Sequence, residues 1–326
     1  MVQMHQFARW LDRDAFHIEF AMPAGGPMPD SLAAMGEIVH AVELGSRFGL
    51  LDVRRLAHLC RERRIDVLHS HNVRANLHAR VAGRMAQVPA RVSTIHNSVF
   101  HYNVSAFHQH LYSAAERLSL RWCDRVIAVS EGIALELHCR YGFPRDRITV
   151  VPNGVDPERL AASASRTQIR SQLGIDPNAA VLLQVGRLTP QKGYDVLFEA
   201  VAQIAQRCPG LEVLAVGDGP LRQELEDLAR RLNIAHVVRF LGHREDVADL
   251  LHAADIVTLA SRSEGMPYTL LEAMGSARAV IATRIGGIEE VIQQEGTAVL
   301  VPSQDPGALA KAIVDLLADP EGTARM

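Results

Sequence analysis

The fold is decided by the stretch Ser263-Glu264-Gly265-Met266-Pro267-Tyr268-Thr269-Leu270-Leu271-Glu272-Ala273-Met274-Gly275. An apolar run, residues 256–259, precedes it and is typical of a buried strand. Pro267 suits the first position of a helix, where its missing N–H costs nothing. The stretch therefore predicts a strand, a loop that contains Glu264, and a helix that carries Glu272 about 1.5 turns from its start.

The start of this predicted helix suits an anion. The first backbone N–H groups of a helix have no intrahelical acceptor, so those of Tyr268, Thr269 and Leu270 are predicted to point toward a ligand. A phosphate fits such a helix start, and a carboxylate beside it can accept hydrogen bonds from a sugar diol. The combination predicts a nucleotide-sugar site. A surface helix with two solvated glutamates is the plainer alternative.

Length and composition indicate a globular protein of two domains. The chain has 326 residues, of which 48% are hydrophobic and 22% are charged, so each half can bury its own core. Residues 1–150 contain 18 Arg, no Lys and 14 Asp or Glu, a net charge of +4; since the whole chain carries −3, the rest carries −7. This positive charge is far below that of a dedicated nucleic-acid binder, and no nucleic-acid partner is expected. It suits an anionic acceptor or an anionic membrane surface.

The cysteines and the hydropathy pattern indicate a cytoplasmic protein. No two of the four cysteines form a Cys-x-x-Cys pair, so neither a zinc site nor a disulfide framework is expected. No apolar run approaches the ~20 residues that span a bilayer, and the first residues lack a signal-peptide pattern. We expect reduced thiols, with peripheral contact to the inner face of the membrane as a further option.

Strand and helix patterns alternate along the chain, which predicts parallel sheets with helices on both faces. Ligands of such sheets bind at the carboxyl ends of the strands. The expected strands are residues 16–20, 67–68, 92–95, 126–129, 148–151, 181–185, 213–216, 237–241, 256–259, 280–282 and 298–301, and the expected helices include residues 2–11, 54–64, 196–206 and 221–232.

A turn-rich junction near the middle of the chain marks the expected domain boundary. The segment Val151-Pro152-Asn153-Gly154-Val155-Asp156-Pro157 interrupts the alternation, and a new strand–helix series follows. We therefore expect an N-terminal domain at residues 1–154 and a C-terminal domain at residues 155–326.

The spacing Glu264-x7-Glu272, together with its flanks, resembles the signature of glycosyltransferase family 4, the group 1 glycosyl transferases. This resemblance implies an α/β chain of the GT-B fold, in which two Rossmann-like, doubly wound parallel-sheet domains face a cleft. It also implies a retaining, hexosyltransferase-like enzyme that needs no metal or cofactor. Its donor would be a nucleotide diphosphate sugar, UDP- or GDP-linked, and its acceptor a glycan or lipid-linked molecule of polysaccharide biosynthesis.

The resemblance also implies roles for individual residues. Arg187 and Lys192, in the segment Gly186–Gly193, would stabilise the leaving diphosphate, and Glu264 would lie near the transferred sugar. His96, which follows the predicted strand at residues 92–95, matches a functional histidine of the acceptor-side domain, although a structural histidine is the alternative. The expected catalytic residues are His96, Arg187, Lys192 and Glu264, and the expected donor-binding residues are Arg187, Lys192, His243, Arg244, Gly265, Met266, Pro267, Thr269, Leu270 and Glu272.

Three other motifs are not expected to bind a metal or a dinucleotide. Asp12-Arg13-Asp14 matches the Asp-x-Asp of metal-dependent glycosyltransferases but lies in a predicted turn. His69 and His71 would share one face of a strand, and no further metal ligand is evident near them. The segment Gly217-Asp218-Gly219 lacks the third glycine of a dinucleotide fingerprint; it resembles a family turn that faces the donor.

Both ends of the sequence differ from the family pattern. The first strand and Gly-rich turn of a doubly wound half are not in the sequence, and we expect about 15 further residues upstream, on ordinary strand and loop lengths. Family members also carry C-terminal helices beyond the last one here. The alternatives are therefore a truncated or non-catalytic nucleotide-sugar-binding protein, or an epimerase or phosphorylase of the same fold.

Overall fold

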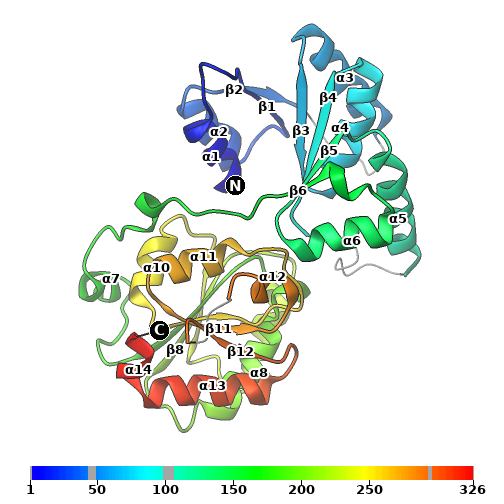
Figure 1. Ribbon diagram of the computed structural model, residues 1–326. Coiled ribbons are helices and arrows are strands. Elements are labelled where there is room, and N and C mark those ends of the chain that lie inside the picture. Colours follow the sequence, from blue (N-terminus) through cyan, green and yellow to red (C-terminus); the bar gives the residue numbers. More distant parts are fainter. Residues whose placement is uncertain (1, 43–48, 98–105, 293–295, 326) are drawn as a thin grey trace. The chain divides into compact units, whose positions relative to one another are not determined.

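The computed structural model describes residues 2–42, 49–97, 106–292 and 296–325 (Figure 1). Its contacts divide the chain into two units. The first unit is built from residues up to Val151, and the second from Pro152 onward together with residues 130–132. Each unit consists of parallel strands alternating with helices, as the sequence pattern predicts.

The second unit is built on one parallel sheet with the strand order β12-β11-β10-β7-β8-β9. Its strands are β7 Ala180–Val185, β8 Leu211–Val216, β9 Val238–Gly242, β10 Ile256–Leu259, β11 Ala279–Thr283 and β12 Val299–Val301. Its helices are η3 Pro157–Leu160, α7 Arg166–Gln172, η4 Pro190–Lys192, α8 Tyr194–Ile204, α9 Arg222–Arg231, α10 Val247–Ala253, α11 Tyr268–Gly275, α12 Gly286–Glu289, α13 Pro306–Ala318 and α14 Pro320–Ala324.

Side-chain alternation along these strands produces one apolar core on each face of the sheet. In β7, Leu182 belongs to the core on one face, whereas Val181 and Leu183 belong to the core on the other. Because successive side chains of a strand point to opposite faces, a continuous apolar run such as that of β7 requires helices on both sides. The unit is therefore a three-layer α/β/α sandwich.

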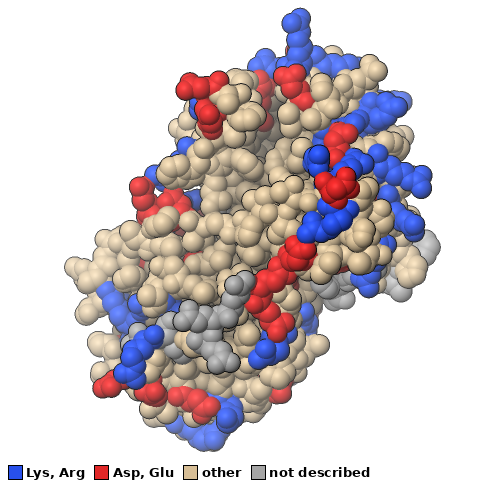
Figure 2. All heavy atoms as spheres, in the orientation of Figure 1, with Lys and Arg blue, Asp and Glu red and all other residues tan. Residues whose placement is uncertain are grey.

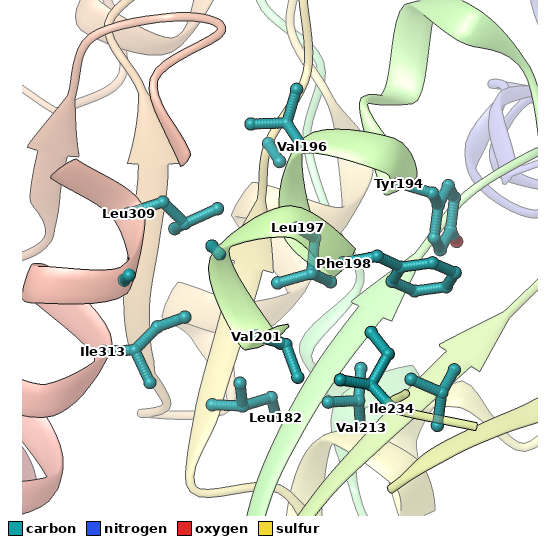
Figure 3. Packing of buried hydrophobic residues seen from close by; sticks show 14 of the residues in the cluster. Leu182, Tyr194, Val196, Leu197, Phe198, Val201, Val213, Ile234, Leu309 and Ile313 are labelled. Carbon is teal, nitrogen blue, oxygen red and sulfur yellow. The ribbon is translucent and has the colours of Figure 1, made fainter. Parts of the chain in front are cut away.

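Figure 3 shows the core that α8 and α13 form with the sheet. Leu197 and Val201 project from α8 toward Leu182 on β7, and Phe198 stands edge-on to Phe240 with ring centroids 5.7 Å apart. Full burial of each such side chain contributes about 1.5–3 kcal/mol. This packing fixes the position of β7, whose carboxyl end carries Arg187.

The first unit contains two separate parallel sheets among its described residues. One has the strand order β3-β4-β5-β6 and the other pairs β1 with β2. The strands are β1 Glu19–Met22, β2 Ile38–Ala41, β3 Val67–His71, β4 Ala90–Ile95, β5 Arg125–Ala128 and β6 Ile148–Val150; the helices are α1 Val2–Trp10, α2 Pro27–Ala34, α3 Leu50–Glu62, α4 Val73–Ala86, α5 Ala106–Leu120, α6 Glu131–Tyr141 and η2 Arg145–Arg147.

The sequence pattern predicts this unit less well than the second. It does not predict β2, whose four residues are too short and too mixed to show a period. It places the first strand at residues 16–20, whereas β1 covers residues 19–22. One doubly wound sheet is expected for this unit, whereas the strands of its described residues fall into two sheets.

A buried ion pair ties α4 and α5 to β4 in the first unit. Nη1 of Arg80 lies 2.8 Å from Oε1 of Glu116, and both side chains are at most 2% exposed. Arg80 also donates to the hydroxyl groups of Ser93 and Ser119. Removal of one partner from such a pair typically costs about 3–5 kcal/mol, because the other charge stays buried.

Candidate active site

The strand order of the second unit reverses between β7 and β10. From β7 the chain proceeds to β8 and β9 on one side, and then returns to β10, β11 and β12 on the other. The loops that follow two strands at such a switch point leave in opposite directions and open a crevice, which is where doubly wound sheets bind ligands. The loops after β7 and β10 are the two that carry Arg187, Lys192 and Glu264.

The loop after β7 approaches the end of β10 at a glycine. Gly193 has φ +63°, and a Cβ atom at this position would lie 2.0 Å from the carbonyl oxygen of Ala260. Both features exclude other residues, because left-handed φ favours glycine and the approach leaves no room for a side chain. Gly193 thus lets Lys192 reach the loop that contains Glu264.

Three further contacts fix the two loops to each other. Nε2 of Gln191 donates to the carbonyl oxygen of Ser263 at 2.8 Å, and the backbone N–H of Arg262 donates to the carbonyl of Gln191 at 2.8 Å. The guanidinium of Arg262 makes a bidentate pair with Asp195, at 2.9 and 2.6 Å. This geometry is the strong form of an arginine–carboxylate contact, and it lowers the pKa of Asp195 against the opposing effect of burial.

Lys192 and Glu264 are paired at the centre of these loops. Nζ of Lys192 lies 2.5 Å from Oε1 of Glu264, whose side chain is only 5% exposed. The hydroxyl of Ser261 donates to the same oxygen at 2.7 Å. The pair places one cation and one carboxylate, 72 residues apart in sequence, at a single point of the switch crevice.

Arg187 is the exposed cation of this site. It lies two residues after the end of β7, and its guanidinium has no carboxylate partner among the residues that the structure describes. An exposed guanidinium without a counterion can bind an incoming phosphate through two N–H groups.

The helix that follows Glu264 begins one residue later than expected. Pro267 is the N-cap, with φ −74° and ψ 128°, and α11 begins at Tyr268. The N–H of Leu270 donates to the carbonyl of Pro267 at 3.2 Å. The Leu270 N–H is therefore not free as predicted, because the first turn closes on Pro267, and its role in donor binding stays a prediction. The predicted roles of Tyr268 and Thr269 N–H groups stay predictions.

Glu272 is a half-buried carboxylate without a hydrogen-bond partner among the described residues. Burial raises its pKa, and only the charge of Arg159 opposes this effect. Next to it, the buried hydroxyl of Tyr268 has no partner in the described part of the chain, and burial together with Glu272 raises the pKa of Tyr268 to about 12. Unsatisfied polar atoms of this kind are expected where a ligand supplies the partner.

One residue of the domain junction, Asn153, supports the same loop. The side-chain amide of Asn153 donates to the carbonyl of Met266 at 2.8 Å, and its backbone N–H contacts the Met266 sulfur at 3.2 Å. The side chain of Met266 is buried. Asn153 thus holds the residues between Glu264 and α11, and it is not among the site residues that the sequence predicts.

The remaining predicted donor residues lie near the ends of β8 and β9. Gly217 donates its N–H to the carbonyl of Gly242 at 2.7 Å, which brings the Gly-Asp-Gly turn beside the end of β9. His243 is exposed. Arg244 makes a bidentate pair with Asp246, so its guanidinium already has a partner. A contact of Arg244 with the donor would therefore come from its backbone and stays a prediction.

In the first unit, His96 belongs to a cluster of half-buried imidazoles. Nε2 of His96 lies 3.3 Å from Nδ1 of His71, and the ring of His69 packs against that of His71 with centroids 4.3 Å apart. His69 also contacts the hydroxyl of Thr94 at 2.8 Å. The ring of Phe7, on α1, packs edge-on against the rings of His69 and His71. Among the described residues no three His, Cys, Asp or Glu side chains are placed to hold a metal ion.

Two family models cover most of the chain. The model described as Glycosyltransferase Family 4 matches residues 2–159, and that described as Glycosyl transferases group 1 matches residues 179–319. A D-inositol 3-phosphate glycosyltransferase of Streptomyces scabiei is 30% identical in an alignment of 338 positions that covers 94% of this chain and 75% of that protein. The chain belongs to glycosyltransferase family 4. These matches confirm the expected family and the expectation that the chain is a glycosyltransferase.

This family 4 chain is also similar to a second curated protein and to a solved structure. An Escherichia coli protein named UDP-Gal:alpha-D-GlcNAc-diphosphoundecaprenol alpha-1,3-galactosyltransferase is 28% identical in an alignment of 318 positions that covers 95% of this chain and 82% of that protein. The structure of Anabaena HepE in complex with UDP-glucose superposes with a TM-score of 0.82 and 24% identity, over 93% of this chain and 83% of that one. The similarity confirms the α/β GT-B fold.

The imidazole cluster of this family 4 chain predicts acid sensitivity of the first unit. Burial lowers the pKa of His69 and His96 to about 4 and that of His71 to about 2, whereas an unfolded histidine titrates near 6.5. Between these values the unfolded chain binds more protons, so stability is complete above pH ~6.5 and falls toward pH ~4. Each histidine contributes at most about 1.4 kcal/mol per pH unit.

Tryptophan fluorescence can measure this effect, because both tryptophans, Trp10 and Trp122, belong to the first unit. We expect the urea midpoint to fall between pH 7 and pH 5, and the fall to be smaller in His71→Asn. His58→Asn is the control, since His58 is exposed. An equal pH dependence in His71→Asn and the wild type would show that the cluster does not cause it.

The Asp12-Arg13-Asp14 motif lies in a turn, as the sequence analysis expects. Oδ1 of Asp12 accepts hydrogen bonds from the backbone N–H groups of Asp14 and Ala15, at 3.0 and 3.4 Å. This is the ordinary role of an aspartate that begins a turn.

Proposed function

We propose that this chain is a retaining, metal-independent hexosyltransferase that moves a sugar from a nucleotide diphosphate sugar to a glycan or lipid-linked acceptor. The observation that carries the proposal is the Lys192–Glu264 pair at the switch point of the second unit. Arg187 in the loop after β7 and Glu272 on α11 add a cation and a carboxylate whose side chains have no hydrogen-bond partner among the described residues. Cations there match a diphosphate, and carboxylates match sugar hydroxyl groups. No cofactor is proposed.

In this proposal the second unit binds the donor and stabilises the leaving group. The bond between the anomeric carbon and the diphosphate oxygen breaks, and the nucleoside diphosphate leaves with its electron pair. Arg187 and Lys192 stabilise that developing charge, which is the kind of interaction that contributes most to catalysis. Glu264 binds hydroxyl groups of the transferred sugar, and Glu272 binds those of the ribose.

The acceptor oxygen forms its bond on the same face of the sugar that the diphosphate leaves, and its proton passes to the departing phosphate. We propose that His96 orients the acceptor or the sugar as a neutral imidazole, since burial lowers its pKa to about 4. The two glutamates do not form the acid–nucleophile pair of a glycosidase, because those residues must flank one bond from opposite sides.

The names of relatives support a UDP-linked donor and a lipid-linked acceptor. The Escherichia coli relative is named for UDP-galactose and a diphosphoundecaprenol acceptor, and the HepE structure contains UDP-glucose. A GDP-linked donor is the second option in the proposal. The chain would work in the cytoplasm, where such donors are made available to polysaccharide biosynthesis.

Peripheral contact with an anionic membrane is part of the proposal for the first unit. Figure 2 shows basic side chains along the side of that unit formed by α3, α4 and α5, with acidic side chains between some of them. These basic residues are arginines, because residues 1–150 contain no lysine. No helix in the described ranges is long and apolar enough to cross a membrane. Binding to phosphatidylglycerol vesicles at low salt, lost at high salt, is expected in co-sedimentation; equal recovery with neutral vesicles would exclude this contact.

Proton nuclear magnetic resonance of the products tests the reaction type. With an α-linked donor and its acceptor, the first product formed is expected to be α-linked, together with free nucleoside diphosphate. A β-linked product would contradict retention. Release of sugar phosphate would identify a phosphorylase. A donor sugar inverted at one carbon, formed without an acceptor, would identify an epimerase.

Glu272→Ala is expected to weaken donor binding by about 1–3 kcal/mol, which is the cost of losing hydrogen bonds to a charged group. Isothermal titration calorimetry with the preferred nucleotide sugar measures the change. Glu321→Ala, on exposed α14, is the matched control. Unchanged affinity in Glu272→Ala would exclude the assignment of Glu272 to the ribose.

A further inference from the structure

A cavity of about 450 Å³ lies at the amino ends of the strands in the second unit. The first residues of three strands line it, namely Ala180 of β7, Ile256 of β10 and Ala279 of β11. Because the strands are parallel, this edge of the sheet is opposite to the edge that carries Arg187 and Glu264. The cavity is therefore separate from the proposed donor site.

Three arginines and one carboxylate provide the charge of this cavity. Arg166, Arg170 and Arg278 line it, together with Asp255. We call it the arginine cavity. Its lining has no other acidic residue, so these side chains carry a net charge of +2.

The carboxylate is fully used by two of the arginines. Oδ1 of Asp255 accepts from Arg166, and Oδ2 accepts from Nη2 of Arg170 and from the N–H of Val181, at 2.7 and 2.8 Å. Arg170 is buried and donates to three backbone carbonyls as well, those of Ala253, Pro177 and Ala179. These contacts anchor α7 to the sheet and leave no acceptor for a third guanidinium.

Arg278 is the arginine without a counterion. Its Nε donates to the carbonyl of Ser276 at 3.1 Å, and its two terminal nitrogens have no acceptor within the described part of the chain. The group is half-buried. Burial and then the charge of Arg166 lower the pKa of Arg278, and Asp255 offsets this only in part.

We propose that the arginine cavity binds a small phosphate monoester through Arg278, with Arg166 beside it. A guanidinium binds two oxygens of a phosphate through parallel N–H groups, and an anion here would neutralise the excess charge. The volume is within the range of small-molecule sites, and Leu316 and Leu317 supply an apolar wall for the carbon part of the ligand. The inference is independent of the transfer reaction proposed above.

The test uses inorganic phosphate and glucose 6-phosphate as probes, with chloride at equal ionic strength as reference. The background is Arg187→Gln, which removes an exposed cation of the donor site and leaves the arginine cavity intact. We expect both probes to raise the melting temperature by about 2–4 °C. Arg278→Gln in this background should weaken phosphate binding about tenfold or more, whereas Arg231→Gln, an exposed arginine on α9, should leave it unchanged.

A second measurement needs no variant at Arg278. Phosphate is expected to protect Arg278 of the wild-type protein from modification by phenylglyoxal, as peptide mass spectrometry measures, and to leave Arg231 unprotected. Equal phosphate affinity in the Arg278→Gln and Arg231→Gln variants, no effect beyond that of chloride, or modification of Arg278 at the same rate with phosphate would each overturn the proposal.

Discussion

Arg187→Ala is expected to lower the rate of sugar transfer about 10²–10³-fold, the size of the effect when one preorganised donor to a developing negative charge is removed. Arg187 is exposed at the end of β7 and has no carboxylate partner among the described residues. Its charge can therefore act on the leaving diphosphate. Because that charge grows as the glycosidic bond breaks, kcat should fall more than donor affinity does.

The experiment compares kcat, KM and the calorimetric donor Kd for the wild type, Arg187→Ala and Arg187→Lys. Arg187→Lys should recover part of the rate, since a lysine restores the charge without the two-pronged geometry. Arg231→Ala, an exposed arginine of the same unit, controls for the loss of one positive charge. Normal turnover in Arg187→Ala would remove this residue from the mechanism.

Gly287→Ala is expected to abolish donor binding, whereas Gly286→Ala should leave it close to that of the wild type. A Cβ atom on Gly287 would lie 1.7 Å from the carbonyl oxygen of Gly265 and 2.6 Å from that of Glu264, but a Cβ atom on Gly286 would have no neighbour within 4 Å. The substitution must displace the backbone that carries Glu264. Overpacking of this kind typically costs about 1–3 kcal/mol of stability as well.

Gly286 and Gly287, adjacent at the start of α12, thus give a test variant and its matched control. Thermal unfolding and donor titration of both variants separate the two effects, because a variant that is folded but does not bind shows a local change at the Glu264 loop. Similar donor affinity in Gly286→Ala and Gly287→Ala would contradict the close packing of α12 on this loop.

The sequence predicts the second unit well because its strands are continuous apolar runs. The expected strand at residues 256–259 coincides with β10, and that at residues 181–185 differs from β7 by one residue. The meeting of Lys192 and Glu264 also follows from the sequence in outline, since both lie after strands that flank the switch point.

Other features depend on tertiary contacts that no local pattern encodes. The closure of the Leu270 N–H onto Pro267 depends on the cap geometry of one turn. The pairing of Arg244 with Asp246 could have been inferred from their spacing of two residues, but its geometry could not. The unsatisfied hydroxyl of Tyr268 and the contact of Asn153 with Met266 become visible only when burial and neighbours are known.

The first unit was harder to predict for the same physical reason. Its β2 strand is half exposed and four residues long, so it lacks the apolar run that identifies β7. The cluster of His69, His71 and His96 combines one strand with the end of the next, as parallel pairing of β3 with β4 requires. The register places His71 opposite Thr94, which is two residues before His96. This position explains why the rings of His71 and His96 lie within contact distance.

Thermal unfolding of the purified chain with UDP-, GDP- and ADP-sugars, each with and without EDTA, tests the central claim most directly. A metal-independent nucleotide-sugar site predicts that one nucleotide series raises the melting temperature by several degrees, that EDTA has no effect, and that Glu272→Ala reduces the shift. The absence of a shift with every donor, or its loss on addition of EDTA, would contradict the account.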